Sequence, residues 1–203
     1  MSATLAPMTA DRTDVRTVLT GGTKIGIVTV VSVLLYLWVS RNVPAAGSVR
    51  AGVETLLVLA AGTAVTFLPG RWCSARSVEG IAGAAGMGLW GALVFSMVDI
   101  VLLRPVHAYP WTWDAVGGGS TWWYLPIWWM FGTFLAWMGG VVTATAPEGT
   151  SLGRTAAPAL IGGIVLAVVA KLVGFGGTLP VMVGAGFAVT LPVLVVVALA
   201  RKA

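Results

Sequence analysis

Charged side chains are scarce in this chain: only 9% of its 203 residues are Asp, Glu, Lys or Arg, while 58% are hydrophobic. A soluble domain carries roughly a quarter charged residues, so this composition excludes an ordinary soluble domain. It predicts an integral membrane protein instead. The length suits one helical bundle rather than two domains.

Cysteine and histidine each occur once, as Cys73 and His107. A single cysteine excludes a disulfide within the chain and any metal site with several cysteine ligands. A single histidine excludes a haem held by two histidines from this chain alone, and a three-histidine metal site as well. The net charge is +5, but the basic residues are spread singly, as at the flanks of membrane helices. This spacing argues against a nucleic-acid partner.

Signature motifs of common enzymes are also missing. The sequence contains no phosphate-binding G-x-x-x-x-G-K-[ST], no G-x-S-x-G and no H-E-x-x-H pattern. Its two halves show no clear match to each other, so an inverted-repeat transporter gains no support. By motif, the sequence therefore names neither a reaction nor a cofactor.

Six apolar segments are long enough to cross a bilayer, which takes about 20 residues and at least ~17. They follow a polar N-terminal arm over residues 1–23. We predict an all-α membrane protein in which residues 24–203 form a bundle of six transmembrane helices. The expected spans are approximately 24–40, 53–69, 78–103, 121–144, 156–173 and 179–200.

The basic residues set the expected orientation, because Lys and Arg concentrate on the cytoplasmic side of membrane proteins. With the N-terminus inside, three basic residues are outside (Arg41, Arg50 and Arg104) and Lys171 lies within a helix. We therefore expect both termini in the cytoplasm and residues 105–120 outside, in the cytoplasmic (inner) membrane of a bacterium. The inner basic residues are Arg12, Arg16, Lys24, Arg71, Arg76, Arg154, Arg201 and Lys202.

Tryptophan is concentrated in one stretch, residues 104–137, which holds seven of the ten Trp residues and the Gly117–Gly119 run. Indole rings gather at bilayer interfaces, so an interfacial belt explains the outer ones. The alternative is an aromatic-lined cavity for an isoprenoid, quinone, carotenoid or other flat apolar ligand. The candidate ligand-binding residues are Trp111, Trp113, Trp122, Tyr124, Trp129 and Trp137.

Asp99 is the strongest single candidate for chemistry. It lies three turns beyond Gly88, in a helix with small residues at every fourth position (Gly80, Ala84, Gly88, Ala92 and Ser96), so it should face the bundle interior. Gly163, Ala167 and Lys171 form a similar stripe. Because an unpaired charge in hydrocarbon costs at least ~2.5 kcal/mol, we predict an Asp99–Lys171 ion pair.

A carboxyl group in a poorly solvated interior holds its proton more tightly and can act as a proton donor. If the protein is an enzyme, Asp99 is the expected acid, with Glu54 or Asp114 as a second carboxylate. His107 lies seven residues before Asp114, a pair that binds a metal only weakly, and a surface histidine in a loop is the favoured interpretation.

The order Asp99, Pro105-Val106, Trp111-x-Trp113, Tyr124-x-Pro126 and Trp137 resembles membrane carotenoid hydratases and related small polytopic proteins. The resemblance is confined to residues 99–137, and its spacings differ by one residue or more. We do not assign the chain to that family. The resemblance implies an isoprenoid substrate.

Two functional interpretations follow. The first is a non-catalytic membrane protein: an accessory or scaffolding subunit, or a component that holds lipid or pigment, whose partners are membrane lipid, other membrane subunits or an apolar isoprenoid. The second is a membrane enzyme that uses Asp99 as an acid on an isoprenoid or lipid, in a pocket lined by Trp122, Trp129 and Trp137. An apolar cavity that opens outward beneath the Trp-rich loop, with Asp99 in its wall, would favour the enzyme. A bundle with no internal cavity and a flat apolar lateral face would favour the accessory subunit.

Overall fold

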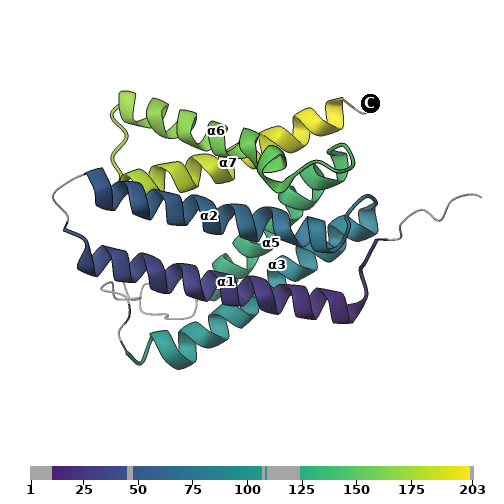
Figure 1. The fold of residues 1–203 in the computed structure, drawn as a ribbon, viewed down its shortest axis with the longest axis horizontal. Coiled ribbons are helices and arrows are strands. Elements are labelled where there is room, and N and C mark those ends of the chain that lie inside the picture. The colour runs from purple at the N-terminus through teal and green to yellow at the C-terminus, as the bar shows by residue number, and fades with distance from the viewer. Residues whose placement is uncertain (1–10, 45–47, 107, 109–123, 202–203) are drawn as a thin grey trace, which may run out of the picture.

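The computed structural model describes residues 11–44, 48–106, 108 and 124–201, and the regular elements in these ranges are all helical (Figure 1). Six helical spans are long and apolar enough to cross a membrane. This confirms the predicted all-helical, polytopic architecture, while the orientation in the membrane stays a prediction. The elements are α1 (Val15–Asn42), α2 (Ser48–Trp72), α3 (Val78–Val98), the π-helical turn η1 (Asp99–Leu103), α5 (Tyr124–Thr145), α6 (Leu152–Leu172) and α7 (Leu179–Ala200).

The first helix begins at Val15 rather than at Lys24, so the last part of the predicted polar arm is helical. Asp14 provides the reason: its carboxylate accepts hydrogen bonds from the backbone N–H and the hydroxyl of Thr17, which caps the helix. A helix of 28 residues is about 42 Å long, compared with about 30 Å of hydrocarbon in a bilayer. Part of α1 must therefore extend into the headgroup layer.

Successive helices alternate in direction, so the bundle has two ends (Figure 1). The end of the bundle where α1 starts and α7 finishes is called the terminal end. The loop end is the opposite one, where α1 finishes, Asp99 lies and α5 starts. In the packing order, α3 lies between α1 and α5, α2 contacts α1, α5 and α7, and the α6–α7 hairpin covers one side.

The small-residue stripe on α3 is a close-packed seam against α5. A Cβ atom at Gly88 would lie 2.5 Å from the carbonyl oxygen of Gly132, and one at Gly140 would lie 3.1 Å from Ala84. On the other side of α5, a Cβ at Gly139 would overlap the carbonyl oxygen of Thr66 in α2. Glycine is required at such positions because the two backbones touch.

Residues before α1 bind the turn between α2 and α3. The carboxylate of Asp11 accepts hydrogen bonds from the hydroxyl and the N–H of Ser77 and from the N–H groups of Arg76 and Gly80. Burial alone would raise the pKa of Asp11, but these hydrogen bonds outweigh it and lower the pKa below its ordinary value of 3.8. The start of the described chain is thereby fixed to the terminal end of the bundle.

Candidate functional site: an apolar cavity beside Asp99

A cavity of about 460 Å³ lies inside the bundle, between α1, α2, α3, α5 and α7. Its volume falls within the range of about 300–1,000 Å³ that is typical of small-molecule sites. On α1 the lining runs from Ile25 to Leu37, which corresponds to about 18 Å along the helix axis. This elongated shape suits a chain-like ligand.

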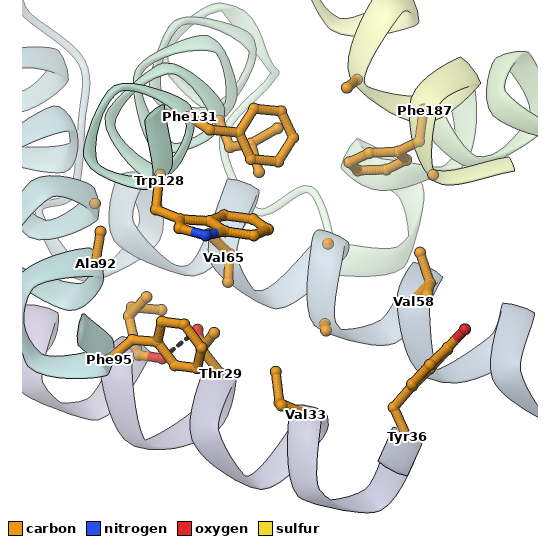
Figure 2. A pocket seen from close by; sticks show the side chains of 18 of the residues that line it. Thr29, Val33, Tyr36, Val58, Val65, Ala92, Phe95, Trp128, Phe131 and Phe187 are labelled. Atoms are coloured by element: carbon orange, nitrogen blue, oxygen red, sulfur yellow. Dashed lines mark hydrogen bonds between the residues drawn. The ribbon is translucent and has the colours of Figure 1, made fainter. Parts of the chain in front are cut away.

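Aromatic rings from four helices form much of the cavity wall. In Figure 2, Trp128 and Phe131 of α5 and Phe187 of α7 face the space from one side, with Phe95 of α3 and Tyr36 of α1 opposite them. Trp128 and Phe131 contact each other edge to face, with ring centroids 6.5 Å apart. Both remain about 40% exposed (39% and 41%), so the cavity is partly open near the start of α5.

Among the described lining residues, polar groups are few: the side chains of Thr29, Tyr36 and Asp99 and the indole N–H of Trp128. The Thr29 hydroxyl donates to the carbonyl of Ile25 in its own helix, as the dashed line in Figure 2 shows. Asp99 is the one carboxyl group among the described lining residues, and it is 99% buried, with a relative exposure of 1%. A polar group of a ligand would meet this carboxyl group at one part of the cavity.

The backbone at Asp99 departs from the α-helical pattern. Asp99 begins η1, and its carbonyl accepts the N–H of Arg104, five residues on. Single π-helical turns inside α-helices occur often at functional sites, because they reorient a side chain at the cost of a regular hydrogen bond. The α-helical backbone of α3 thus changes to a π-helical turn at Asp99, the residue that borders the cavity.

Glu54, the predicted second carboxylate, is buried near the start of α2 but does not line the cavity. It accepts a hydrogen bond from the Ser40 hydroxyl at 2.6 Å and forms an ion pair with Arg50 at 2.9 Å. Next to it, the Arg41 guanidinium donates to the carbonyl of Ala108. These contacts link α1, α2 and the chain after η1 at the loop end, which is a structural role.

Asp99 and Lys171 do not come together. Lys171 is exposed at the end of α6, and no salt bridge within the described ranges joins it to Asp99. Gly163 and Ala167 are indeed buried against α7. However, α6 packs mainly against α7, whereas Asp99 follows α3, which lies between α1 and α5, so the two stripes face different helices.

The predicted aromatic residues divide into three groups. Trp129 packs in the seam, where its indole N–H donates to the Ser96 hydroxyl at 3.1 Å, and Trp137 is 50% exposed. Neither lines the cavity. Tyr124 starts α5, but its side chain lies outside the described residues, together with Trp111, Trp113 and Trp122 and the polar candidates His107 and Asp114.

Trp128 is the cavity residue that sequence reasoning missed, since it adjoins Trp129 but points about 100° away around the helix. The spacing of small residues in α5 does mark the helix face on which Trp128 lies. Trp128 lies four residues before Gly132, which starts the series Gly132, Ala136 and Gly140 on the face that α5 turns towards α3. Of the other missed aromatics, Phe131 lies in the same aromatic-rich stretch as Trp128, whereas Tyr36, Phe95 and Phe187 carry no such signal.

Other candidate sites add little. Among the described residues, no group of three His, Cys, Asp or Glu side chains could hold a metal ion. Cys73 is buried directly after α2, and this burial, with Asp11 and Asp14 nearby, raises the pKa of its thiol to about 11. A thiol of that kind is protonated at neutral pH and is a poor nucleophile.

Comparisons of the chain with protein-family models, with curated proteins and with solved structures find no match. The function is therefore inferred from the geometry of the cavity.

Proposed function

We propose that this protein binds a long apolar molecule, of isoprenoid or lipid type, in the cavity between α1, α2, α3, α5 and α7. The observation that carries the proposal is the position of Asp99, a buried carboxyl group in the wall of an otherwise apolar space. An ionisable residue at membrane depth is costly, and such residues mark ligand or ion sites in membrane proteins.

The chemistry of the wall indicates the kind of ligand. Aliphatic and aromatic side chains surround most of the space, so the body of the ligand is apolar. Asp99 can accept a hydrogen bond from a hydroxyl or amine when ionised, or donate one to a carbonyl when protonated. The ligand that fits is a hydrocarbon chain with one polar group or one reactive double bond placed beside Asp99.

Within the non-catalytic interpretation, the cavity favours one alternative. A purely scaffolding subunit needs packing faces but no internal space, whereas a component that holds lipid or pigment needs such a space. The exposed apolar side chains on α6, such as Ile161, Val165 and Val168, are what contact with lipid tails requires and indicate no particular partner. Ligand binding therefore accounts for more of the structure than scaffolding does.

The test is to purify the protein in a mild detergent and identify the bound small molecules by mass spectrometry. We expect an isoprenoid or lipid at near-equimolar amount in the wild type. In the Asp99→Asn variant we expect at least a tenfold lower occupancy, because a hydrogen bond to a charged group contributes about 1.5–3 kcal/mol. Glu148→Gln, the same change at an exposed residue near the terminal end, is the matched control. Equal occupancy in Asp99→Asn and the wild type would refute the role of Asp99.

A second candidate function is acid catalysis on that ligand, and it is favoured by the aromatic rings in the same wall as Asp99. In this reaction the Asp99 carboxyl group transfers its proton to one carbon of an alkene, which leaves a carbocation on the other carbon. Aromatic faces stabilise such a cation. Water then adds and returns a proton to Asp99, or a neighbouring carbon loses one and the double bond moves.

Heavy water distinguishes catalysis from binding. Incubation of the loaded wild-type protein in D2O should place deuterium on carbon in the recovered molecule, because the transferred proton exchanges with solvent before each turnover. Asp99→Asn should give none. Recovery of the molecule without deuterium on carbon from the wild type would leave ligand binding as the function and exclude the acid step.

A further inference from the structure

A second pocket lies at the terminal end of the bundle, far along α1 from the loop end, with a volume of about 270 Å³. Its lining comes from three helices: α1 provides Arg16, Thr17, Thr20, Gly21 and Lys24, α2 provides its last residue, Trp72, and α3 provides Met87. No carboxylate among the described residues belongs to this lining, although the hydroxyl of Thr17 donates to Asp14 next to it. The pocket combines two cations with hydroxyl groups and the aromatic ring of Trp72.

The spacing on α1 produces this arrangement. Arg16, Thr20 and Lys24 are four residues apart and therefore lie on one face of the helix, towards Trp72. Gly21 lets α3 come close: a Cβ there would lie 2.6 Å from the sulfur of Met87. The result is a hollow with Met87 beneath it and basic side chains at its margin.

Both cations border the pocket, eight residues apart on α1. The Lys24 Nζ atom lies 5.7 Å from the centroid of the Trp72 ring, a cation–π contact that holds the ammonium beside the pocket. Arg16 and Lys24 are both exposed, and no salt bridge within 4 Å joins either of them to a carboxylate in the described part of the chain. Asp14, the N-cap residue before α1, accepts hydrogen bonds from Thr17, and these bonds, together with the charge of Arg16, lower its pKa.

The depth of the pocket indicates which anion it meets. Counting about 20 residues back from Arg41 at the loop end, the hydrocarbon layer ends near Gly22. Lys24 is then at the boundary, and Arg16, Thr17 and Thr20 lie in the headgroup layer, where lipid phosphates are found. The ring of Trp72 lies beside Lys24 at this boundary, where the acyl chains begin.

We propose that this pocket binds the phosphate headgroup of an anionic membrane lipid, with Arg16 and Lys24 on the phosphate and the first part of an acyl chain against the ring of Trp72. Basic pockets between transmembrane helices bind anionic headgroups, with a contribution from each cation near the surface. A free phosphate ion would gain nothing from the Trp72 ring. A lipid phosphate uses both parts of the site.

The test is native mass spectrometry of the full-length protein in detergent, titrated with phosphatidylglycerol or phosphatidylcholine of the same acyl chains. We expect phosphatidylglycerol to bind at about tenfold lower concentration than phosphatidylcholine. The Arg16→Gln/Lys24→Gln variant should lose this preference. Arg154→Gln/Arg201→Gln, which removes two exposed charges from the same end of the bundle, should keep it.

Two further arms make the outcome decisive. The exchange variant Arg16→Lys/Lys24→Arg conserves both charges and should retain the preference, which separates loss of charge from damage to the fold. Inorganic phosphate at millimolar concentration should not displace phosphatidylglycerol. The proposal is overturned if the wild type binds both lipids equally, if both Gln variants lose the preference alike, or if free phosphate competes effectively.

Discussion

The seam between α3 and α5 and the cavity beside it are built from the same helices but follow opposite packing rules. In the seam, Gly88, Gly132 and Gly140 bring backbones into direct contact, and Ala84 and Ala136 fill what remains. Around the cavity the same α5 presents Trp128 and Phe131, large rings that face a space they do not fill. The difference shows that small residues set how closely two helices approach, while aromatic rings that face each other across a gap leave room for a ligand.

The largest effect is expected at the closest contact between two helix backbones, where Gly139 of α5 meets Thr66 of α2. Gly139→Ala introduces a Cβ that overlaps the carbonyl oxygen of Thr66, so α2 and α5 must move apart. We expect a loss of about 3 kcal/mol in the free energy of unfolding, as for severe overpacking. Thermal unfolding in detergent measures it. Gly52→Ala in α2, where a Cβ meets nothing within 4 Å, is the matched control and should change little.

A substitution at Gly62 can fill the cavity without disturbing the close backbone contacts between helices. Gly62 lines the cavity, and a Cβ there would contact only the Phe187 ring, at 3.5 Å. Gly62→Leu therefore directs a side chain into the ligand space, and we expect ligand occupancy to fall about tenfold while the unfolding temperature is maintained or rises. Gly52→Leu, the same change in the same helix but outside the lining, should leave occupancy unchanged. Full occupancy in Gly62→Leu would mean that the ligand binds elsewhere.

A smaller effect is expected at the border between the two regions. Trp129→Phe keeps the ring in the seam but removes the indole donor to the Ser96 hydroxyl. The loss should be about 0.5–1.5 kcal/mol of stability, the contribution of one hydrogen bond. Ligand occupancy should stay the same because Trp129 is not in the cavity lining. A marked loss of ligand with unchanged stability would contradict this division of roles.

The smallest effect concerns the terminal end. The folded-state pKa of Asp11 is depressed, so its contribution to stability is present above its ordinary pKa of 3.8 and is lost as the pH falls through the lower folded value. Asp11→Asn should therefore lower the unfolding temperature slightly at pH 7, and the difference from the wild type should shrink towards pH 3. Glu148→Gln, in an exposed turn, should show no such pH dependence. A difference that grows on acidification would contradict the assigned hydrogen bonds.

Much of this architecture could be predicted from the sequence because it depends on composition and helical period. The six spans follow from apolar length, and the four-residue stripe on α3 correctly indicates the face that meets α5. The burial of Asp99 follows as well, because eleven residues after Gly88 is close to a whole number of turns. These features are properties of single helices.

The cavity itself could not be predicted in this way, because its volume depends on how far apart five helices stand. Lys171 shows one limit: a stripe of small residues marks a buried face but does not say which helix covers it, and α6 packs against α7 rather than α3. Trp128 and Trp129 show another. Two adjacent indoles point about 100° apart, and although the glycine series marks the face of Trp128, only the spacing of the neighbouring helices leaves a cavity there.

The most direct test of a ligand-filled cavity is photocrosslinking with a long-chain fatty or prenyl probe that carries a diazirine, followed by peptide mapping. The account predicts adducts on cavity residues such as Phe95, Phe131 and Phe187, and suppression of these adducts by excess unlabelled lipid extract from the same cells. Adducts on lipid-facing Val165 and Val168 of α6 should persist under the same competition. Labelling confined to the outward-facing residues, with none on the cavity wall, would contradict the central claim.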